Sequence, residues 1–334
     1  MNLDVLIPSL LLPAPMHKLL SPPIVPALER LLARADRQLE VTPAGSSWLF
    51  EHWGVVAPYP FAPLLAEYDG LDASNDAWML AEPVHLAPEG KLLKLFPARF
   101  LELKATETAV LIADLNTHFA DRHLQFIAPT HDRWYVRCSP SEIPGTTSTD
   151  AARFSSLADF QPKSTGALDW RSLQNEAQML FFGHPVNDAR EVTGKPTVSG
   201  VWFWGGGILP KLKRPTYDSV VANSPLATQF AKKTAIDVLP LSWDSIQSAQ
   251  GNVLAVIDSC AEFAGNADLL AWERELGRLD REWFLPMSQA LGKGEIQRLN
   301  IHVPGNGSAS SFHLTRRNHL LRFWRTAMPL SSYA

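Results

Sequence analysis

The side chains best suited to binding chemistry lie in the stretch 184–195 of this 334-residue chain. Arg190 and Lys195 can donate charge-assisted hydrogen bonds to an anion, and Asn187 can orient them. His85, in an earlier segment, could face the same cleft. We therefore predict that Asn187, Arg190, Lys195 and His85 bind an anionic group. The alternative is a network of internal hydrogen bonds that closes a turn.

Regular elements are predicted on both sides of this stretch. A helix is expected over 168–182, with Asp169 as its cap and apolar residues at three- and four-residue steps. A second helical turn over 188–192 leads through breaker residues to an apolar strand over 198–204. The glycines at 205–207 follow, where a plain loop is favoured over a ligand-binding loop.

These residues resemble the cofactor-independent phosphoglycerate mutases, particularly their archaeal-type branch in the alkaline phosphatase superfamily. That branch has a similar His-Pro-Val-Asn run, an Arg and a Gly-Lys turn before a strand that ends in glycines. Over the whole chain, the sequence is similar to a bacterial phosphoglycerate mutase-related family that includes the regulatory protein RpfE. The segments that carry this resemblance are Pro83–Leu86, Arg133–Tyr135, Asn175–Met179 and Trp202–Gly205. The resemblance implies an α/β fold, with an alkaline phosphatase-like three-layer core and an inserted smaller α+β domain.

The resemblance also implies where two metal ions would be held. In the mutases the first strand ends in Asp-Gly, but the run 3–12 read here as that strand leads into Leu-Pro-Ala. A later Asp-x-x-Gly-His motif has Glu262 and Asn266 at its ligand positions, and Asn is a poor substitute for imidazole. The last strand carries His302 without a preceding Asp. We therefore expect a degenerate metal site and predict no cofactor, with Mn or Zn required only if a phosphoesterase activity persists.

The core is predicted from hydrophobic patterning along the rest of the chain. Helices and strands are expected where apolar residues recur with period 3.6 or in short β-branched runs. The expected core helices are 26–35, 224–233 and one from Leu269 capped by Asn266, and the expected core strands are 235–241, 252–257 and 297–303. Near Pro97 the pattern changes to a helix ending at 120 and two strands, 123–128 and 133–138. The predicted domains are a core over 1–100, an insertion over 101–195 and a second core part over 196–334.

Composition limits the class of protein. A hydrophobic content of 46% is ample for a sizeable core, and a net charge of −4 gives no basic footprint for nucleic acid or anionic lipid. No run of 18 apolar residues could span a bilayer, and the start lacks the positive flank of a signal peptide. We predict a cytoplasmic protein that binds neither nucleic acid nor membrane.

Other reactive side chains are given structural interpretations. Glu82 could meet His85 at a cleft, although a simple structural hydrogen bond is the alternative. The chain has only two cysteines, Cys138 and Cys260, and they are far apart in the sequence. We therefore expect both to be buried, reduced thiols. The basic aromatic tail 312–325 could hold a phosphate or an acidic partner, or could protect an edge of the sheet.

The preferred function hypothesis is a catalytically degenerate mutase-like protein that binds a small anionic ligand or an unidentified protein partner in regulation. The alternative is a metal-dependent phosphoesterase or phosphomutase with a rearranged site. The altered ligand positions argue against a glycolytic mutase, because no activated nucleophile accompanies them.

Overall fold

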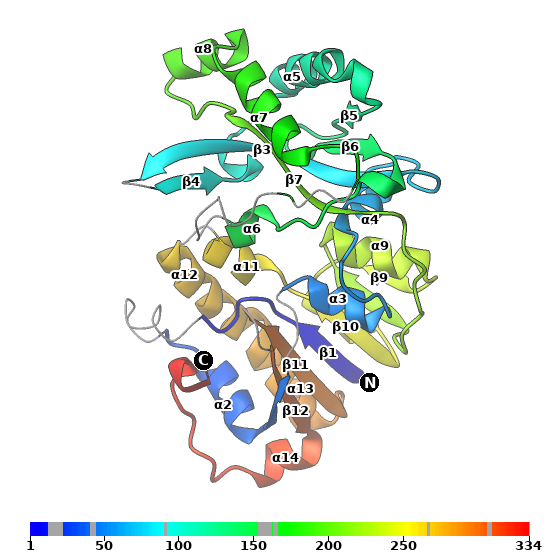
Figure 1. Ribbon diagram of the computed structural model, residues 1–334. Coiled ribbons are helices and arrows are strands. Elements are labelled where there is room, and N and C mark those ends of the chain that lie inside the picture. The colour runs from blue at the N-terminus through cyan, green and yellow to red at the C-terminus, as the bar shows by residue number, and fades with distance from the viewer. Residues whose placement is uncertain are drawn as a thin grey trace. The chain divides into compact units, whose positions relative to one another are not determined.

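The computed structural model describes residues 1–12, 23–40, 45–89, 92–152, 162, 166–265, 268–305 and 309–333. The chain forms two compact units: unit 1 comprises Met1–Val55 and Leu212–Ala334, and unit 2 comprises Val56–Lys211 (Figure 1). The fold is mixed α/β, with one sheet in each unit. Within the described ranges, no helix combines the length and the apolar character needed to cross a membrane.

Unit 1 is built on a seven-stranded sheet in the order β2-β12-β11-β1-β10-β8-β9. Its parallel strands are β1 (Asn2–Leu6), β8 (Ser219–Ala222), β9 (Asp237–Leu239), β10 (Asn252–Val256) and β11 (Arg298–Pro304). Strands β12 (Ala309–Thr315) and β2 (Asp36–Glu40) continue the sheet in antiparallel pairing. The basic tail therefore begins as β12, an inner strand, and β2 is the edge strand beside it.

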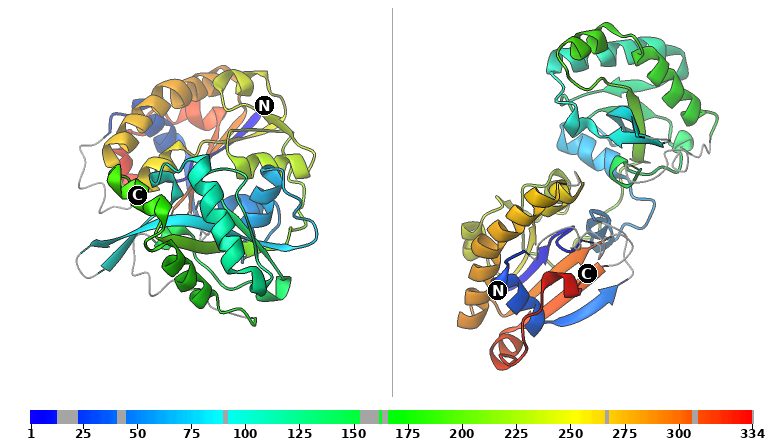
Figure 2. Two further views of the ribbon diagram at one scale, coloured as in Figure 1. Left: turned by 90° about the horizontal axis from the view of Figure 1, so that it is seen from above. Right: turned by 90° about the vertical axis from the view of Figure 1, so that its left-hand side faces the viewer.

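Helices α2 (Pro26–Arg34), α12 (Leu269–Leu279) and α13 (Leu285–Lys293) pack with the sheet into the core of unit 1. Leu3 and Val5 of β1 alternate toward this core, where they join Trp272 and Leu276 of α12. The right-hand view of Figure 2 shows the yellow-to-orange helices lying along one face of this sheet. The remaining helices of the unit are α3 (Ser47–His52), α9 (Pro225–Lys233), α10 (Trp243–Ser248), α11 (Ser259–Gly265) and α14 (Arg316–Leu321).

Asp280 caps helix α2 from a distant part of the chain. Its carboxylate accepts hydrogen bonds from the backbone N–H groups of Ala27 (3.2 Å) and Leu28 (2.7 Å), whereas Val25, the N-cap residue, makes no side-chain cap. Asp280 is buried, and it opens a π-helical turn, Asp280–Phe284, between α12 and α13. A carboxylate in this place satisfies free backbone donors and interacts favourably with the helix dipole.

We expect Asp280→Ala to lower the free energy of unfolding by about 2–3 kcal/mol, because two buried backbone donors lose a charged acceptor. Asp280→Asn should cost less, since an amide oxygen can still accept one of the two hydrogen bonds. Urea-induced unfolding followed by circular dichroism, together with hydrogen exchange of the α2 amides, measures the effect. Glu282→Ala is the matched control, because Glu282 is 54% exposed and pairs only with a surface arginine. Equal losses from Asp280→Ala and Glu282→Ala would contradict the capping role.

Unit 2 contains an antiparallel five-stranded sheet organised on the long strand β3 (Ala77–Glu89). Strand β3 pairs with β4 (Leu92–Phe96), β6 (Tyr135–Cys138) and β7 (Gly200–Gly207), and β6 pairs with β5 (Gln125–Ile127). Its helices are α4 (Phe61–Tyr68), α5 (Ala105–His118), α6 (Thr149–Ala152), α7 (Trp170–Phe181) and α8 (Pro185–Val192). Helices α5 and α7 cover one face of this sheet through a shared apolar core.

The unit boundaries differ from the predicted domains 1–100, 101–195 and 196–334. Strand β3, expected in the first core part, and strand β7, expected in the second, pair with each other in unit 2. Unit 2 spans 56–211, between the two sequence segments that form unit 1. An apolar run predicts a strand but not which sheet it joins, because the pairing partner lies more than a hundred residues away.

The three glycines at 205–207 lie inside β7 and not in the expected loop. A Cβ on Gly206 would come within 2.5 Å of the Met79 side chain, and one on Gly207 within 2.6 Å of Pro60. These glycines therefore allow close packing beside β3, where the pairing with β7 shifts register.

Several of the predicted helices and strands are present, some with shifted ends. The strand expected over 3–12 ends at Leu6, because Ile7 and the following residues turn away. Helix α7 is capped by Asp169 as predicted, and strand β10 occupies the predicted buried run. Helix α12 is capped by Asp268, whose side chain accepts the N–H of Ala271. The predicted cap, Asn266, lies outside the described residues.

Candidate functional site

The predicted anion-binding segment folds as the end of α7, helix α8 and the approach to β7. Gly183, at φ +67°, supplies the left-handed residue between the two helices. Asn187 is buried and donates from Nδ2 to the carbonyls of Phe181 (2.8 Å) and Val198 (2.9 Å). Its Oδ1 accepts the N–H of Val198 (2.8 Å). Asn187 therefore ties the turn to the chain that enters β7.

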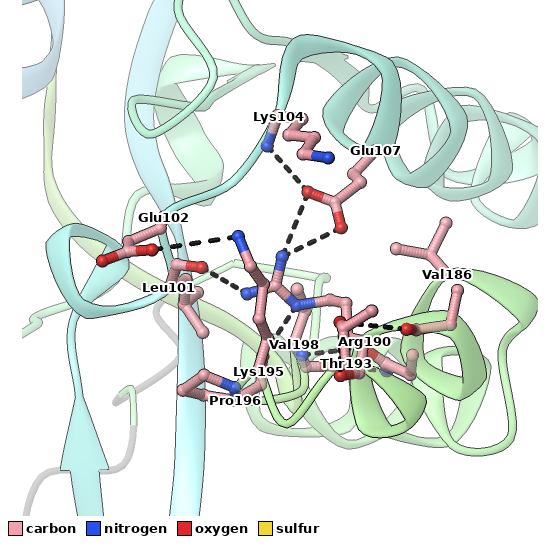
Figure 3. Close-up of polar contacts among 12 residues, drawn as sticks. Leu101, Glu102, Lys104, Glu107, Val186, Arg190, Thr193, Lys195, Pro196 and Val198 are labelled. Atoms are coloured by element: carbon pink, nitrogen blue, oxygen red, sulfur yellow. Dashed lines mark hydrogen bonds and ion pairs between the residues drawn. The ribbon is translucent and has the colours of Figure 1, made fainter.

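Arg190 is the most buried charged residue of the described chain, at 1% exposure. Its guanidinium donates to the Pro196 carbonyl (2.7 Å), to both carboxylate oxygens of Glu107 (3.0 Å each) and to the Leu101 carbonyl (Figure 3). Burial raises the pKa of Glu107, but hydrogen bonds from Lys104 N–H and Arg190 outweigh it and leave this pKa below its usual value. The arrangement is a closed turn network, the alternative to an anion site.

The other two predicted ligand-binding residues also contact the chain itself. The Lys195 ammonium lies 3.8 Å from the Glu102 carboxylate, and the Lys195 side chain is half-buried whereas Glu102 is exposed (Figure 3). His85 Nδ1 lies 2.9 Å from the carbonyl oxygen of Thr197, and the ring packs near Phe96. The fold thus brings these residues into unit 2 without directing their polar groups at a common point.

Glu82 and His85 do not form the predicted pair. They stand three residues apart in β3, so their side chains leave opposite faces of the sheet. The Glu82 carboxylate accepts hydrogen bonds from the Thr149 hydroxyl (2.8 Å) and the Trp204 indole N–H (2.8 Å). Burial raises the pKa of Glu82, and these two donors oppose the rise.

His184 has a structural role that the sequence did not predict. Its Nδ1 accepts the N–H of Val186 (3.1 Å) and so caps helix α8. Nε2 must then carry the proton, which it donates to the Asp114 carboxylate (2.8 Å). The sequence signal for this capping role is the His-Pro pair. Proline favours the first position of a helix, which makes the preceding His184 the cap residue.

The residues at the strand ends of unit 1 that the sequence singled out as altered ligand positions are dispersed. Strand β1 ends at Leu6, before the Leu-Pro-Ala run. Glu262 lies in α11, and Asn266 is outside the described residues. Over the part of the chain that the structure describes, no three His, Cys, Asp or Glu side chains are placed to hold a metal ion. Both cysteines are buried, and burial raises the pKa of Cys138 to about 12.

A cluster of polar side chains lies on one face of the sheet of unit 1. These side chains alternate along the strands with the apolar ones that point into the core of the unit. Asp4 in β1 accepts hydrogen bonds from the Asn300 amide (2.7 Å) and the Tyr217 hydroxyl (2.9 Å). Asn300 Oδ1, in turn, accepts from Nδ1 of His313 (2.9 Å), because the Asn300 amide nitrogen already faces Asp4. The chain Tyr217–Asp4–Asn300–His313 is therefore bonded from end to end.

His302 lies beside this chain on the same strand as Asn300. Its Nδ1 contacts the Ser311 hydroxyl (3.0 Å), and its ring centre is 4.9 Å from that of Trp48 and 6.3 Å from that of His313. Burial lowers the pKa of His302 to about 4, so the imidazole is neutral at pH 7. The Nε2 atoms of His302 and His313 are buried and have no hydrogen-bond partner within the described chain.

The sequence signal for this cluster is the alternation of polar with apolar residues along β11 and β12. Asn300 and His302 in β11, and Ser311 and His313 in β12, share one face because strands repeat every two residues. Asp4 lies in the middle of β1. The register places it directly opposite Asn300.

Comparisons with known proteins place the fold. The chain matches no protein-family model and no curated protein sequence. It is similar to the PH0037 protein from Pyrococcus horikoshii, with a TM-score of 0.54 and 14% identity over 94% of this chain and 87% of that chain. At this identity the likeness shows a shared fold alone. A cofactor-independent phosphoglycerate mutase from Thermoplasma acidophilum DSM 1728 matches with a TM-score of 0.43 and 16% identity over 94% and 89% of the two chains, and nothing is inferred from it.

Proposed function

We propose that this chain is a catalytically degenerate, phosphoglycerate mutase-like protein of the RpfE-related kind, which acts in regulation by binding a small anionic ligand or another protein. Its core is taken to be alkaline phosphatase-like, and unit 2 to be the insertion of that architecture. The sequence resemblance motivates the proposal. The contacts of the reactive side chains support it.

One observation carries the proposal: both oxygens of the Asp4 carboxylate already accept hydrogen bonds, from Asn300 and Tyr217. A divalent cation needs several ligand atoms that converge with free lone pairs. Here each carboxylate oxygen already accepts one hydrogen bond, at 2.7 and 2.9 Å, and the described residues place no group of three metal-ligating side chains around the lone pairs that remain. The cluster is thus built as a hydrogen-bonded part of the sheet.

The second candidate is a metal-dependent phosphoesterase or phosphomutase with a rearranged site. It is favoured by the buried, unpartnered Nε2 atoms of His302 and His313, since imidazole nitrogen is a ligand for Mn and Zn. Two imidazoles do not fit such an ion without a third ligand, and the described residues place none there. No catalytic step follows from this arrangement.

Metal analysis and a hydrolysis assay separate the two candidates. We expect purified protein to hold no stoichiometric Mn or Zn and to leave p-nitrophenyl phosphate intact when either ion is added. We also expect a small anion such as phosphoglycerate, or a bound protein, to raise the melting temperature. Metal-dependent hydrolysis that is lost in His302→Ala, but kept in His85→Ala, would overturn the proposal in favour of the phosphoesterase.

A further inference from the structure

The segment after β12 exposes an unusual density of large apolar side chains. Of the large hydrophobic residues that the structure shows exposed, five fall within nine positions of this segment. They are Leu320 (50%), Leu321 (52%), Phe323 (74%), Trp324 (66%) and Met328 (46%). Phe323 and Trp324 stack edge to face on each other, with ring centres 5.6 Å apart. Contiguous exposed apolar surface of this kind marks interaction sites.

The same segment is strongly basic in a protein whose net charge is −4. Residues 316–333 contain four arginines and neither Asp nor Glu. Helix α2 and strand β2, which pack beside α14, add Arg30, Arg34 and Arg37. One of the four, Arg322, is paired with Asp36 at 2.7 Å. The remaining charge makes this region complementary to an acidic partner.

A cavity of about 520 Å³ opens between α2, β2 and the C-terminal segment. Its lining includes Leu32, Met328, Arg37 and Arg325, together with Asp36, whose carboxylate is paired with Arg322. Arg37 donates to the Ser310 hydroxyl (3.1 Å) and the Tyr333 carbonyl, and Arg325 donates to backbone carbonyls of α2 and the residue after it. Both guanidiniums are therefore bonded to neutral groups. Because each carries five N–H donors, donors remain for a carboxylate.

We propose that this C-terminal arginine surface, formed by Arg37, Arg325, Phe323, Trp324 and Met328, binds an acidic segment of another protein. Carboxylates of the partner would pair with Arg37 and Arg325, and an aliphatic or aromatic side chain would enter the cavity beside Met328. Arginine forks suit carboxylates in two parallel hydrogen bonds, and arginine and tryptophan dominate binding energy at interfaces. The inference rests on the proposed binding function and names its partner.

A protein segment fits this surface better than a membrane does. A common mode of membrane-surface binding uses an amphipathic helix with a basic polar face. Helix α14 has only six residues, and the apolar side chains 323–328 follow it in non-helical chain. The cavity lined by Arg37 and Arg325 is also of a size to receive side chains of a partner segment.

Fluorescence anisotropy with a labelled twelve-residue peptide of alternating Glu and Leu tests the surface. We expect saturable binding that weakens as salt is raised. The double variant Phe323→Ser with Trp324→Ser, and separately Arg325→Gln, should each weaken binding roughly tenfold or more. Arg171→Glu, a charge reversal at an exposed position of unit 2, should leave binding unchanged. Circular dichroism confirms that each variant is folded.

Several outcomes would overturn the inference. One is a failure of the acidic peptide to bind saturably. Another is binding of that peptide by the folded variants as strongly as by the wild type. A third is equally strong binding of a peptide in which Lys replaces Glu. Binding to phosphatidylserine vesicles without binding to the peptide would assign the surface to membranes instead. Failure here leaves the proposed binding function open to another surface, whereas metal-dependent hydrolysis would overturn that function without changing peptide binding.

Discussion

Arg190→Ala should lower the free energy of unfolding of unit 2 by about 3–5 kcal/mol. The substitution leaves the Glu107 carboxylate without its cation and removes the donor of the Leu101 and Pro196 carbonyls. It also empties a space that a fully buried side chain fills. Breaking a buried ion pair by removing one partner costs more than the pair contributes, because the other charge stays buried.

Urea-induced unfolding of the full chain, with hydrogen exchange over 101–107 and 185–198, measures this loss. Arg190→Lys should recover only part of it, since one ammonium group cannot reach three acceptors in different directions. Arg171→Ala, at an exposed position of α7, should change stability by less than about 0.5 kcal/mol.

The same variants decide between the turn network and the predicted anion site. If Arg190→Ala cost less than about 1 kcal/mol, the network would not be structural. If phosphate raised the melting temperature of the wild type but not that of folded Arg190→Lys, the anion-binding prediction for Arg190 would regain its basis. A shared response of both proteins to phosphate would place the anion elsewhere.

Acid should destabilise unit 1 by about 2–3 kcal/mol between pH 7 and pH 4.5 through His302 alone. Burial lowers the folded-state pKa of His302 to about 4, against an ordinary value of 6.5. The unfolded chain therefore binds the proton as pH falls below 6.5, whereas the folded chain does so only near pH 4. This stability is present above pH 6.5 and is lost as pH falls toward the folded pKa.

The free energy of unfolding as a function of pH tests this directly. His302→Gln, which can keep a hydrogen bond to Ser311, should show a shallower loss between pH 6.5 and 4.5 than the wild type. Nearby Asp4, His52 and His313 also act on the His302 pKa, so the difference between the two proteins is the informative quantity. His131→Gln, whose side chain is exposed, is the control. Parallel slopes for wild type and His302→Gln would refute the assignment.

Much of the local structure could be predicted from the sequence. Helix α7 with its Asp169 cap, helix α9 and strand β10 were predicted because their apolar spacing and end signals lie within a few neighbouring residues. The mixed α/β class was expected from the family resemblance, and the structure confirms it.

Only the tertiary structure decided which reactive groups meet. Arg190 finds Glu107 across 83 residues, and Asp280 reaches the start of α2 across more than 250. Sheet register joins Asp4 to Asn300 across 296 residues. Local spacing shows that such a side chain can donate or accept a hydrogen bond. Which partner it finds depends on strand pairing and helix packing between distant segments, and these contacts joined Arg190 to Glu107 and placed a histidine cluster on the sheet.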